Sequence, residues 1–258
     1  MTFVLPSFGS SVISAAPASG GGGGAWNGNT YSLDLDGTND YMDCGNVNDL
    51  DSATAFSMSL WVLFGTGEIS GKQCFISSGG DTNNHLRLHK GSNHEVRFQV
   101  VNAGSGSDIS GLTSVVLSEN TWHHVAVTYS SGTCKIYIDA SLRNTGTTGS
   151  ASSTNGDDFS IGRLAPFNTH YFGGLMDEVA IWNATLSDAD ITAIYNSGAP
   201  TDLSLAASYD TDRTSNLIHW WRMGDNDGGT GTTITDQGSG GNDGTLINGP
   251  TFSTTVPT

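Results

Sequence analysis

Basic residues are scarce in this sequence. Its 258 residues include nine Lys and Arg against 25 Asp and Glu, which gives a formal net charge of −16. Such a charge repels nucleic acid and anionic lipid, and no stretch approaches the roughly 18–20 apolar residues of a membrane span. We therefore expect neither a nucleic-acid partner nor a membrane span. The acidic surface suits cation binding, although a simply solvated surface is the plainer explanation.

Cysteine is also scarce. The three cysteines, Cys44, Cys74 and Cys134, are far apart, odd in number and match no metal-ligand spacing. A disulfide framework is therefore not expected. Cys134 alternates in phase with Ile136 and Ile138, a pattern that predicts a small, buried, apolar side chain.

A recognisable signal peptide is missing as well. Residues 1–19 contain no Lys or Arg before their apolar part, and Pro6 and Gly9 interrupt it, so we do not expect secretion through a signal peptide. Five glycines then form a flexible linker. We expect residues 1–24 to be an arm and Gly-rich linker ahead of one domain at 25–258. Six large apolar side chains in the arm favour docking on a partner, with a disordered terminus as the alternative.

Glycine, by contrast, is abundant. Short apolar runs are separated by Gly, Ser, Thr, Asn and Asp, a composition typical of many strands joined by turns. Residues 31–36, 56–64 and 96–101 show the alternation of a half-buried strand, and 121–142 predicts a hairpin that turns at Ser131-Gly132. One large all-β domain accounts for both the pattern and the length.

Residues 171–198 predict one long strand, a tight corner and a short helix. Ser187 followed by Asp190 forms a variant capping box that begins a helix near 188–197, and Gly198 ends it. Period-two alternation over the strand at 172–182 divides its side chains between two faces: Leu175, Asp177, Val179 and Ile181 against Met176, Glu178, Ala180 and Trp182.

Three segments carry a family resemblance. FGGLMDEVAIWNATLSDADITAIYNSG, at 172–198, resembles the most recognisable segment of the LamG-like jelly-roll modules of the concanavalin A-like lectin/glucanase superfamily. WHHVAVTYSSGTCKIYIDA, at 122–140, resembles a second segment, with Ala140 where Gly is usual, and LDGTNDYMDCGN, at 35–46, resembles the family's opening. The resemblance implies an all-β fold, an antiparallel β-sandwich of the concanavalin A-like jelly-roll type with one short helix. It specifies a fold more firmly than a function.

The C-terminal segment suggests a permuted chain order. LIHWWRMGDNDGGTGTTITDQGSGGNDGTLINGP, at 217–250, resembles a segment that comes first in many family members. We infer that residues 217–257 close the sandwich within the same chain, with strand exchange between neighbouring copies as the alternative. This order resembles virion-appendage proteins of marine tailed phages. The resemblance implies a place on the virion exterior and contact with other virion proteins through residues 1–24, and we expect a homo-oligomer.

An enzymatic role needs a suitable pair of acids. The superfamily also contains glycoside hydrolases, which use two carboxyl groups facing one cleft. The acidic pair on the long strand is Asp177-Glu178, and adjacent strand residues point to opposite faces. Asp34 and Asp36 share a face but lie on a short, edge-like strand. The sequence therefore predicts a protein that is not an enzyme.

Asp177 is the leading candidate for a metal ligand. We place it on an apolar strand face, where an unpaired carboxylate is costly. Many family members bind calcium near the matching segments, so the resemblance implies a structural Ca²⁺ held by Asp177 together with Asp36 and Asp40. Asp177 could instead cap a turn or pair with Arg163. A weaker candidate is a zinc site at three histidines of one hairpin: His85, His89 and His94.

A glycan site would need exposed aromatic rings flanked by polar groups. Most tryptophans lie inside strand patterns, where packing is the default role. The loop residues Phe167, His170 and Tyr171 are the remaining candidates for ligand binding. We predict a non-enzymatic virion surface or adhesion protein that uses its sandwich to recognise a host-surface glycan. A purely structural decoration protein without a ligand is the alternative, followed by a glycan hydrolase.

Overall fold

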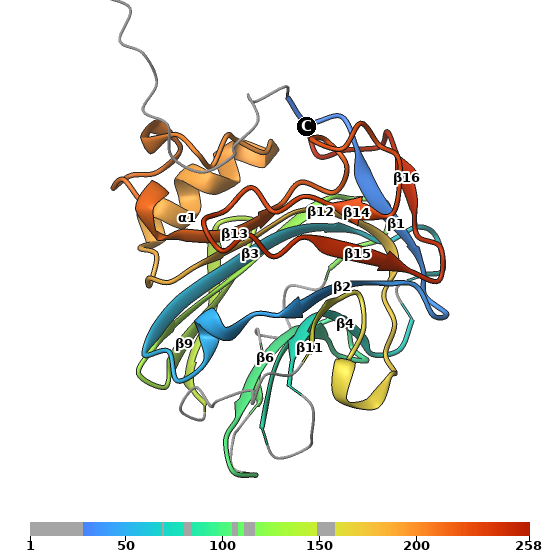
Figure 1. Cartoon of the computed structure of the whole chain (residues 1–258). Helices are drawn as coiled ribbons and strands as arrows, with labels where there is room; N and C mark the ends of the chain where they lie inside the picture. Colours follow the sequence, from blue (N-terminus) through green and yellow to red (C-terminus); the bar gives the residue numbers. More distant parts are fainter. Residues whose placement is uncertain (1–27, 69, 80–83, 105–107, 111–116, 149–157) are drawn as a thin grey trace, which may run out of the picture.

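The computed structural model shows an antiparallel β-sandwich, and the described residues include 46% in strands and a single short α-helix (Figure 1). The structure describes residues 28–68, 70–79, 84–104, 108–110, 117–148 and 158–258. The predicted arm at 1–24 lies outside these ranges. In the ranges described, no helix combines the length and the apolar character that a membrane crossing requires.

In the described part of the chain, two sheets of eight strands each form the sandwich. In spatial order the first, sheet A, contains β10 (Ser141–Thr147), β9 (Thr133–Ile138), β8 (His123–Ser130), β3 (Ala55–Leu63), β12 (Gly173–Trp182), β1 (Ser32–Asp36) and β16 (Thr251–Ser253), and β13 (Leu217–Trp221) also pairs with β12. Sheet B contains β14 (Thr233–Ile234), β15 (Gly244–Ile247), β2 (Tyr41–Asn46), β11 (Asp158–Ile161), β4 (Gln73–Ser78), β5 (His85–Lys90), β6 (Val96–Val101) and β7 (Asp108–Ser110).

The predicted alternation produces two apolar layers. The inner faces of the two sheets enclose the main core, which contains Phe56, Phe98, Ile136 and Trp221. Cys134 belongs to it, which confirms its predicted burial, and Cys44 and Cys74 are buried as well. A second cluster lies on the outer face of sheet A, under the helix layer. Because Trp221 enters the first cluster and the adjacent Trp220 the second, both faces of β13 are covered.

The helix layer contains α1 (Asp188–Tyr195). The described chain also has five 3₁₀ turns: η1 (Asn48–Leu50), η2 (Ala165–Phe167), η3 (Asn196–Gly198), η4 (Ala206–Ser208) and η5 (Thr214–Asn216). The predicted capping box begins α1: the Ser187 side chain accepts the N–H of Asp190, and the Asp190 carboxylate accepts the N–H of Ser187. Asn196, with φ of 44°, ends the helix.

A β-bulge breaks the predicted alternation in β12. Asp177 pairs with Trp61 of β3, and Ala180 pairs with Ser59, so Glu178 and Val179 together oppose one residue. Glu178 adopts a φ of 48°, in the left-handed region. Val179 therefore enters the main core, whereas Asp177 lies on the outer face. The prediction that Asp177 shares a face with Val179 is wrong for this reason.

The C-terminal segment is part of the sandwich. β13 pairs with β12, β15 with β2 and β16 with β1, so strands from 217–257 complete both sheets of their own chain. Asp236 joins the part of this segment that follows β13 to β13 itself, because its carboxylate lies 2.7 Å from His219 Nδ1 and accepts the N–H groups of Trp220, Gly238 and Asn242. His219 in turn stacks on Trp221.

Candidate functional site

The outer face of sheet B carries the basic side chains that define the candidate site. In β5, Leu86 and Leu88 face the core, so the side chains between and beside them face outward. The register places Arg87 opposite Gln99 and His89 opposite Arg97. We call the following set the basic face: Lys72, Arg87, His89, Arg97, Arg163 and His170.

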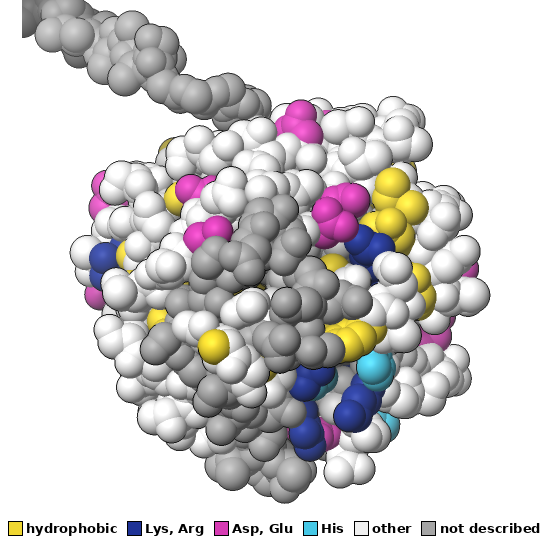
Figure 2. All heavy atoms as spheres, turned by 60° about the horizontal axis from the view of Figure 1, so that its bottom comes forward, with side chains coloured by type: hydrophobic (Ala, Val, Ile, Leu, Met, Phe, Trp, Pro, Cys, Tyr) yellow, Lys and Arg dark blue, Asp and Glu magenta, His cyan; other side chains and the backbone are white. Residues whose placement is uncertain are grey.

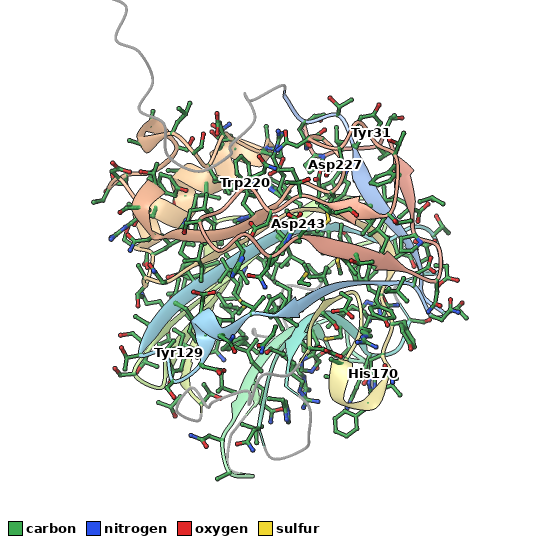
Figure 3. All side chains as sticks on the ribbon, in the orientation of Figure 1. Tyr31, Tyr129, His170, Trp220, Asp227 and Asp243 are labelled. Atoms are coloured by element: carbon green, nitrogen blue, oxygen red, sulfur yellow. The ribbon has the colours of Figure 1, made fainter. Side chains whose placement is uncertain are left out.

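The loop at 162–172 brings His170 to this face. A bridge between Leu164 and Thr169 closes the loop, and the carbonyl of His170 accepts the N–H of Cys74 at 2.8 Å. His170 itself adopts a φ of 55° and lies on the opposite side of the sandwich from Trp220 (Figure 3). Phe167, at the tip of the same loop in η2, is 43% exposed.

A small pocket opens where the loop meets β4 and β5. Its volume is about 30 Å³, and its lining comprises Lys72, Gln73, Cys74, Arg87, His89, Leu164 and His170. One water needs about 10–15 Å³ of such space. The pocket therefore admits a water or two, or one small substituent of a ligand, but not a sugar ring.

The electrostatics of the basic face are unlike the rest of this acidic protein. Burial lowers the pKa of His89 well below its usual range, and the positive charges of Arg87 and Arg97 add to the effect. Burial also lowers the pKa of His170, and the positive charges of Lys72 and Arg87 lower it further. Figure 2 shows basic and histidine side chains gathered on this side of the molecule.

Acidic residues form ion pairs with two arginines of the basic face. The Arg97 Nη2 atom lies 2.6 Å from Glu95 Oε1, and Arg163 Nη2 lies 3.6 Å from the mostly exposed Asp158. Neither acid lines the pocket. Arg163 also covers the Tyr41 ring at 3.7 Å, which fixes its guanidinium against the sheet.

A second hollow lies on the outer face of sheet A. Its volume is about 320 Å³, and its lining is rich in hydroxyl groups: Thr128, Ser130, Thr133, Lys135, Thr185, Leu186, Ser187 and Asp188. Lys135 Nζ lies 2.7 Å from Asp188 Oδ1, which also accepts the hydroxyl of Tyr137. We call it the hydroxyl groove. It is large enough for a sugar ring, but no exposed aromatic side chain is among its lining residues.

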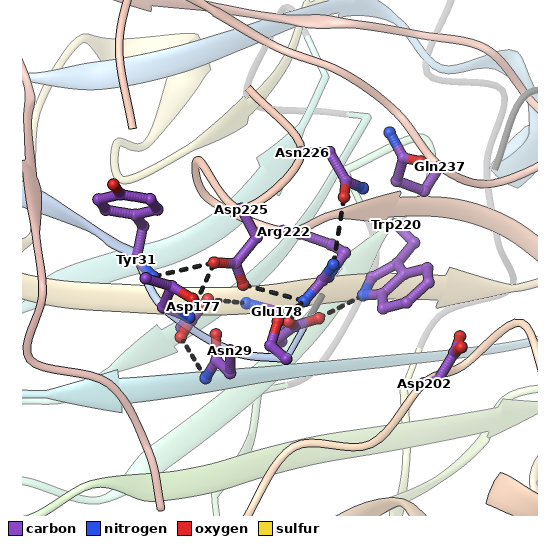
Figure 4. A network of polar contacts seen from close by, with 12 residues as sticks. Asn29, Tyr31, Asp177, Glu178, Asp202, Trp220, Arg222, Asp225, Asn226 and Gln237 are labelled. Atoms are coloured by element: carbon purple, nitrogen blue, oxygen red, sulfur yellow. Dashed lines mark hydrogen bonds and ion pairs between the residues drawn. The ribbon is translucent and has the colours of Figure 1, made fainter. Parts of the chain in front are cut away.

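A third cluster is sealed inside the molecule. Glu178 accepts hydrogen bonds from Arg222 Nε at 3.1 Å and from the indole of Trp220, while Arg222 also reaches Asp225 at 2.9 Å (Figure 4). Asp177 accepts from the Asn29 amide at 3.0 Å. The bulge thus brings Asp177 and Glu178 into one polar network, and the argument that adjacent strand residues must separate them is wrong.

This cluster is closed to a substrate. Asp177 and Glu178 are 0% and 3% exposed, and the cavity beside Glu178 has a volume of only about 10 Å³, no more than one water requires. Burial and the neighbouring Glu178 raise the pKa of Asp177 well above its usual range. Burial likewise raises the pKa of Glu178, with Arg222 opposing the shift.

The three predicted calcium ligands do not converge. One oxygen of Asp36 accepts the N–H groups of residues 38–40, and Asp40 accepts the N–H of Asp36, so the loop's own backbone occupies these oxygens. Asp36 pairs with Gly173, four residues from Asp177, or roughly 13 Å along the strand. Across the described ranges, no three His, Cys, Asp or Glu side chains meet as a metal site. Asp36, Asp40 and Asp177 therefore do not fit one shared ion, and calcium binding stays a prediction.

The predicted zinc histidines do not form a group of three either. His85 and His89 lie on the outer face of β5, while His94, with a φ of 66°, lies in the turn before β6. His89 instead lines the pocket with Lys72 and Arg87. Neither this pocket nor a role for Lys72 and Arg87 in it was predicted from the sequence. The alternating run HLRLHK, at 85–90, could have shown that one strand face is basic.

The comparisons with known proteins agree with this architecture. Residues 36–192 match the Laminin_G_3 family model, described as the concanavalin A-like lectin/glucanases superfamily. The chain belongs to the Laminin_G_3 family. No relative among curated proteins matches the sequence.

Solved structures similar to this Laminin_G_3 chain include carbohydrate-related proteins. A Bacteroides ovatus protein proposed to bind carbohydrate has a TM-score of 0.61 at 18% identity, with 89% of this chain and 61% of that one covered. Domain 4 of a Geobacillus stearothermophilus arabinanase, in complex with arabinotriose, has a TM-score of 0.52 at 21% identity (62% and 74% covered).

A third similar structure is a carbohydrate-binding module. The CBM40 of a Ruminococcus gnavus sialidase, bound to α2,3-sialyllactose, has a TM-score of 0.51 at 12% identity, with 63% of this chain and 95% of that one covered. At these identities the likeness establishes the fold alone. The present chain spans about three fifths of the Bacteroides ovatus protein.

Proposed function

We propose that this chain is a non-catalytic carbohydrate-recognition module that binds a glycan on the outer face of sheet B. The pocket at the foot of the 162–172 loop carries the proposal. Leu164 and His170, near the two ends of that loop, line the pocket, and the exposed ring of Phe167 lies between them in sequence. An aromatic ring beside a few convergent polar groups is the usual composition of a sugar site.

A purely binding role is supported by the state of the acids. A glycosidase needs two carboxyl groups that reach the scissile bond from opposite sides, about 5–9.5 Å apart. Asp177 and Glu178 are buried and committed to Asn29, Arg222 and Trp220. Some similar structures are parts of glycoside hydrolases, but a shared fold does not carry an activity with it, so this likeness does not favour catalysis.

We infer a virion exterior as the setting. The support is the sequence resemblance to phage appendage proteins and the permuted order of the C-terminal segment. In this setting residues 1–24 attach the module to other virion proteins, a homo-oligomer multiplies weak glycan contacts, and a structural Ca²⁺ is an added expectation. Deleting residues 1–24 from the gene in the intact particle tests the attachment. Incorporation of the truncated protein at the normal level would rule it out.

A glycan array with the full chain tests the binding function. Phe167→Ala should weaken binding of any positive glycan about 10-fold or more, because a sugar ring loses its stacking surface. Leu205→Ala is the matched control, since Leu205 is 53% exposed and outside both hollows. Absence of binding to every glycan and host surface would favour the purely structural role. Release of reducing ends from a polysaccharide would instead reveal an enzyme.

A further inference from the structure

We propose that the glycan is acidic, and that a carboxylate or sulfate group of it enters the pocket between Lys72, Arg87, His89 and His170. This inference rests on the proposed glycan-binding function and names the chemical class of its ligand.

The first step is the distribution of charge. The protein has nine Lys and Arg and a net charge of −16, yet four of the nine belong to the basic face. Two of these four, Lys72 and Arg87, line the pocket, and no Asp or Glu of the described part of the chain does. On an acidic protein, such a concentration creates a local positive field that attracts an anionic group.

The second step is the chemistry of the pocket wall. His89 is only 6% exposed, and its Nδ1 atom is buried without a hydrogen-bond partner within the part of the chain that the structure describes. A buried polar nitrogen without a partner is costly, and a ligand that supplies one recovers that cost. The Lys72 ammonium donates, and His89 Nδ1 donates in the neutral tautomer that carries its proton there, so an acceptor group on the ligand matches both.

The third step is size. At about 30 Å³ the pocket holds a single substituent rather than a sugar ring. A ring would therefore lie on the open face beside Phe167, with its charged substituent directed inward. A neutral hydroxyl would also fit, but it would bring no negative charge to the Lys72 ammonium at the pocket wall.

A polyanion such as nucleic acid suits this surface poorly. Its phosphates would extend beyond the small basic face onto a surface with an excess of acidic residues, where they would be repelled. A glycan with isolated acidic groups avoids this repulsion. Single-stranded DNA is therefore a useful competitor, and displacement of the glycan by it at equal phosphate and carboxylate concentrations would contradict the inference.

Matched oligosaccharide pairs test the proposal with the full chain. Oligogalacturonate is compared with its methyl ester, and a sulfated galactan oligosaccharide with its desulfated form, by calorimetry at 0.05 and 0.5 M NaCl. At least one acidic member should bind about 10-fold or more tightly than its neutral partner, and the added salt should remove most of that difference. The two pairs distinguish a carboxylate from a sulfate ligand.

Two variants with one lost charge locate the site. Lys72 is exposed, so Lys72→Gln should leave the fold intact, as circular dichroism checks, and should weaken binding of the acidic glycan about 10-fold. Lys135→Gln removes the same charge from the hydroxyl groove and should leave binding unchanged. Loss with Lys135→Gln and not with Lys72→Gln would overturn the inference.

Failure of the inference and failure of the proposed function give different results. Equal binding of acidic and neutral partners would overturn the acidic-ligand inference while leaving carbohydrate recognition in place. Absence of binding to every glycan, acidic or neutral, would overturn both. An acidic preference that persists fully in Lys72→Gln and at high salt would also contradict the proposed pocket.

Discussion

Arg222 Nε lies 3.1 Å from Glu178 Oε1, with both side chains almost fully buried. The pair joins the end of β13 to the bulge of β12 across strands that are about 40 residues apart in sequence. Asp225, also buried, shares the same guanidinium, and Asp177 lies next to Glu178. One positive charge therefore faces three carboxyl groups, and burial makes full ionisation of all three unfavourable.

This imbalance predicts a stability that falls as pH rises. The folded-state pKa values of Asp177 and Glu178 lie above their ordinary values of 3.8 and 4.5, so the folded protein holds protons that the unfolded chain releases. Their contribution is fully present below about pH 4 and is lost as pH rises through the folded-state values. Asp177→Asn should remove about 1–3 kcal/mol of that loss between pH 5 and 8, measured by urea unfolding.

The control for this effect is Asp210→Asn, which neutralises an exposed carboxylate on the surface. Its stability should follow the wild-type pH profile. If Asp177→Asn and Asp210→Asn gave the same profile, the buried carboxyl cluster would not be the source of the pH dependence.

His124 predicts the opposite pH dependence. Its ring is buried between Trp61 and Tyr195, neither ring nitrogen has a hydrogen-bond partner in the described ranges, and burial lowers its pKa to about 4. Between these pH values the His124 ring is protonated in the unfolded chain and neutral in the folded protein, so stability is lost as pH falls from 6.5 towards 4. In His124→Phe, the unfolding free energy should fall by about 2–3 kcal/mol less over that pH range than in the wild type.

Urea unfolding at pH 7.5 and 4.5 measures this difference, and His94→Gln, in the half-exposed turn before β6, is the control. Asp177 and His124 change the unfolding free energy with pH in opposite directions. The pH profile of the wild type alone therefore cannot show the contribution of either residue. A His124→Phe variant whose two unfolding energies differ as much as those of the wild type would refute the assignment to His124.

The layers and strand faces could be predicted because they depend on local periodicity. The alternation at 56–64 and the capping box at Ser187 are contained within a few residues, and both have the expected structure. Closure by the C-terminal segment is inferred from its resemblance to a segment that comes first in many family members, and β13, β15 and β16 pair within this chain. These features need no knowledge of which distant side chains meet.

The bulge and the pocket could not be predicted because they depend on long-range register. A Glu at positive φ has no sequence signal, since Gly and Asn are the residues that adopt this region readily, and one extra residue moved Asp177 to the opposite face. The pocket joins Lys72, His89 and His170, which lie on three separate segments. Of the predicted loop candidates, His170 lines the pocket, Phe167 lies on the loop above it, and the role of Tyr171 stays a prediction.

The contacts of Asp236 predict a large contribution to the stability of the C-terminal segment. Its carboxylate is fully buried, lies 2.7 Å from His219 Nδ1 and accepts three backbone N–H groups. Asp236→Ala leaves these buried donors unsatisfied and should cost about 3–5 kcal/mol of unfolding free energy. Hydrogen exchange should accelerate first at β13. Asp212→Ala, an exposed residue that caps its own turn through Thr214, should change little, and equal effects of the two variants would count against this role for Asp236.

Ala140 predicts a stabilising substitution. It follows Asp139 in the turn between β9 and β10, where the two residues have φ values of 58° and 51°. An L-residue with a side chain pays about 1–2 kcal/mol for this conformation, whereas Gly adopts it freely but loses more entropy on folding. Ala140→Gly should therefore raise the unfolding free energy by about 0.5–1 kcal/mol, which is roughly 1–4 °C in Tm for a chain of this size.

Asp139 is unsuitable for the same change because its carboxylate accepts the N–H of His124 at 2.9 Å and lies 2.9 Å from His123 Nδ1. The matched control is Ala206→Gly, in η4, where φ is negative and Gly brings only its entropic cost. Thermal unfolding should move in opposite directions for the two variants. A lower Tm for both would mean that the turn after β9 holds Ala140 without strain, and that the Gly usual in the family at this position has another purpose.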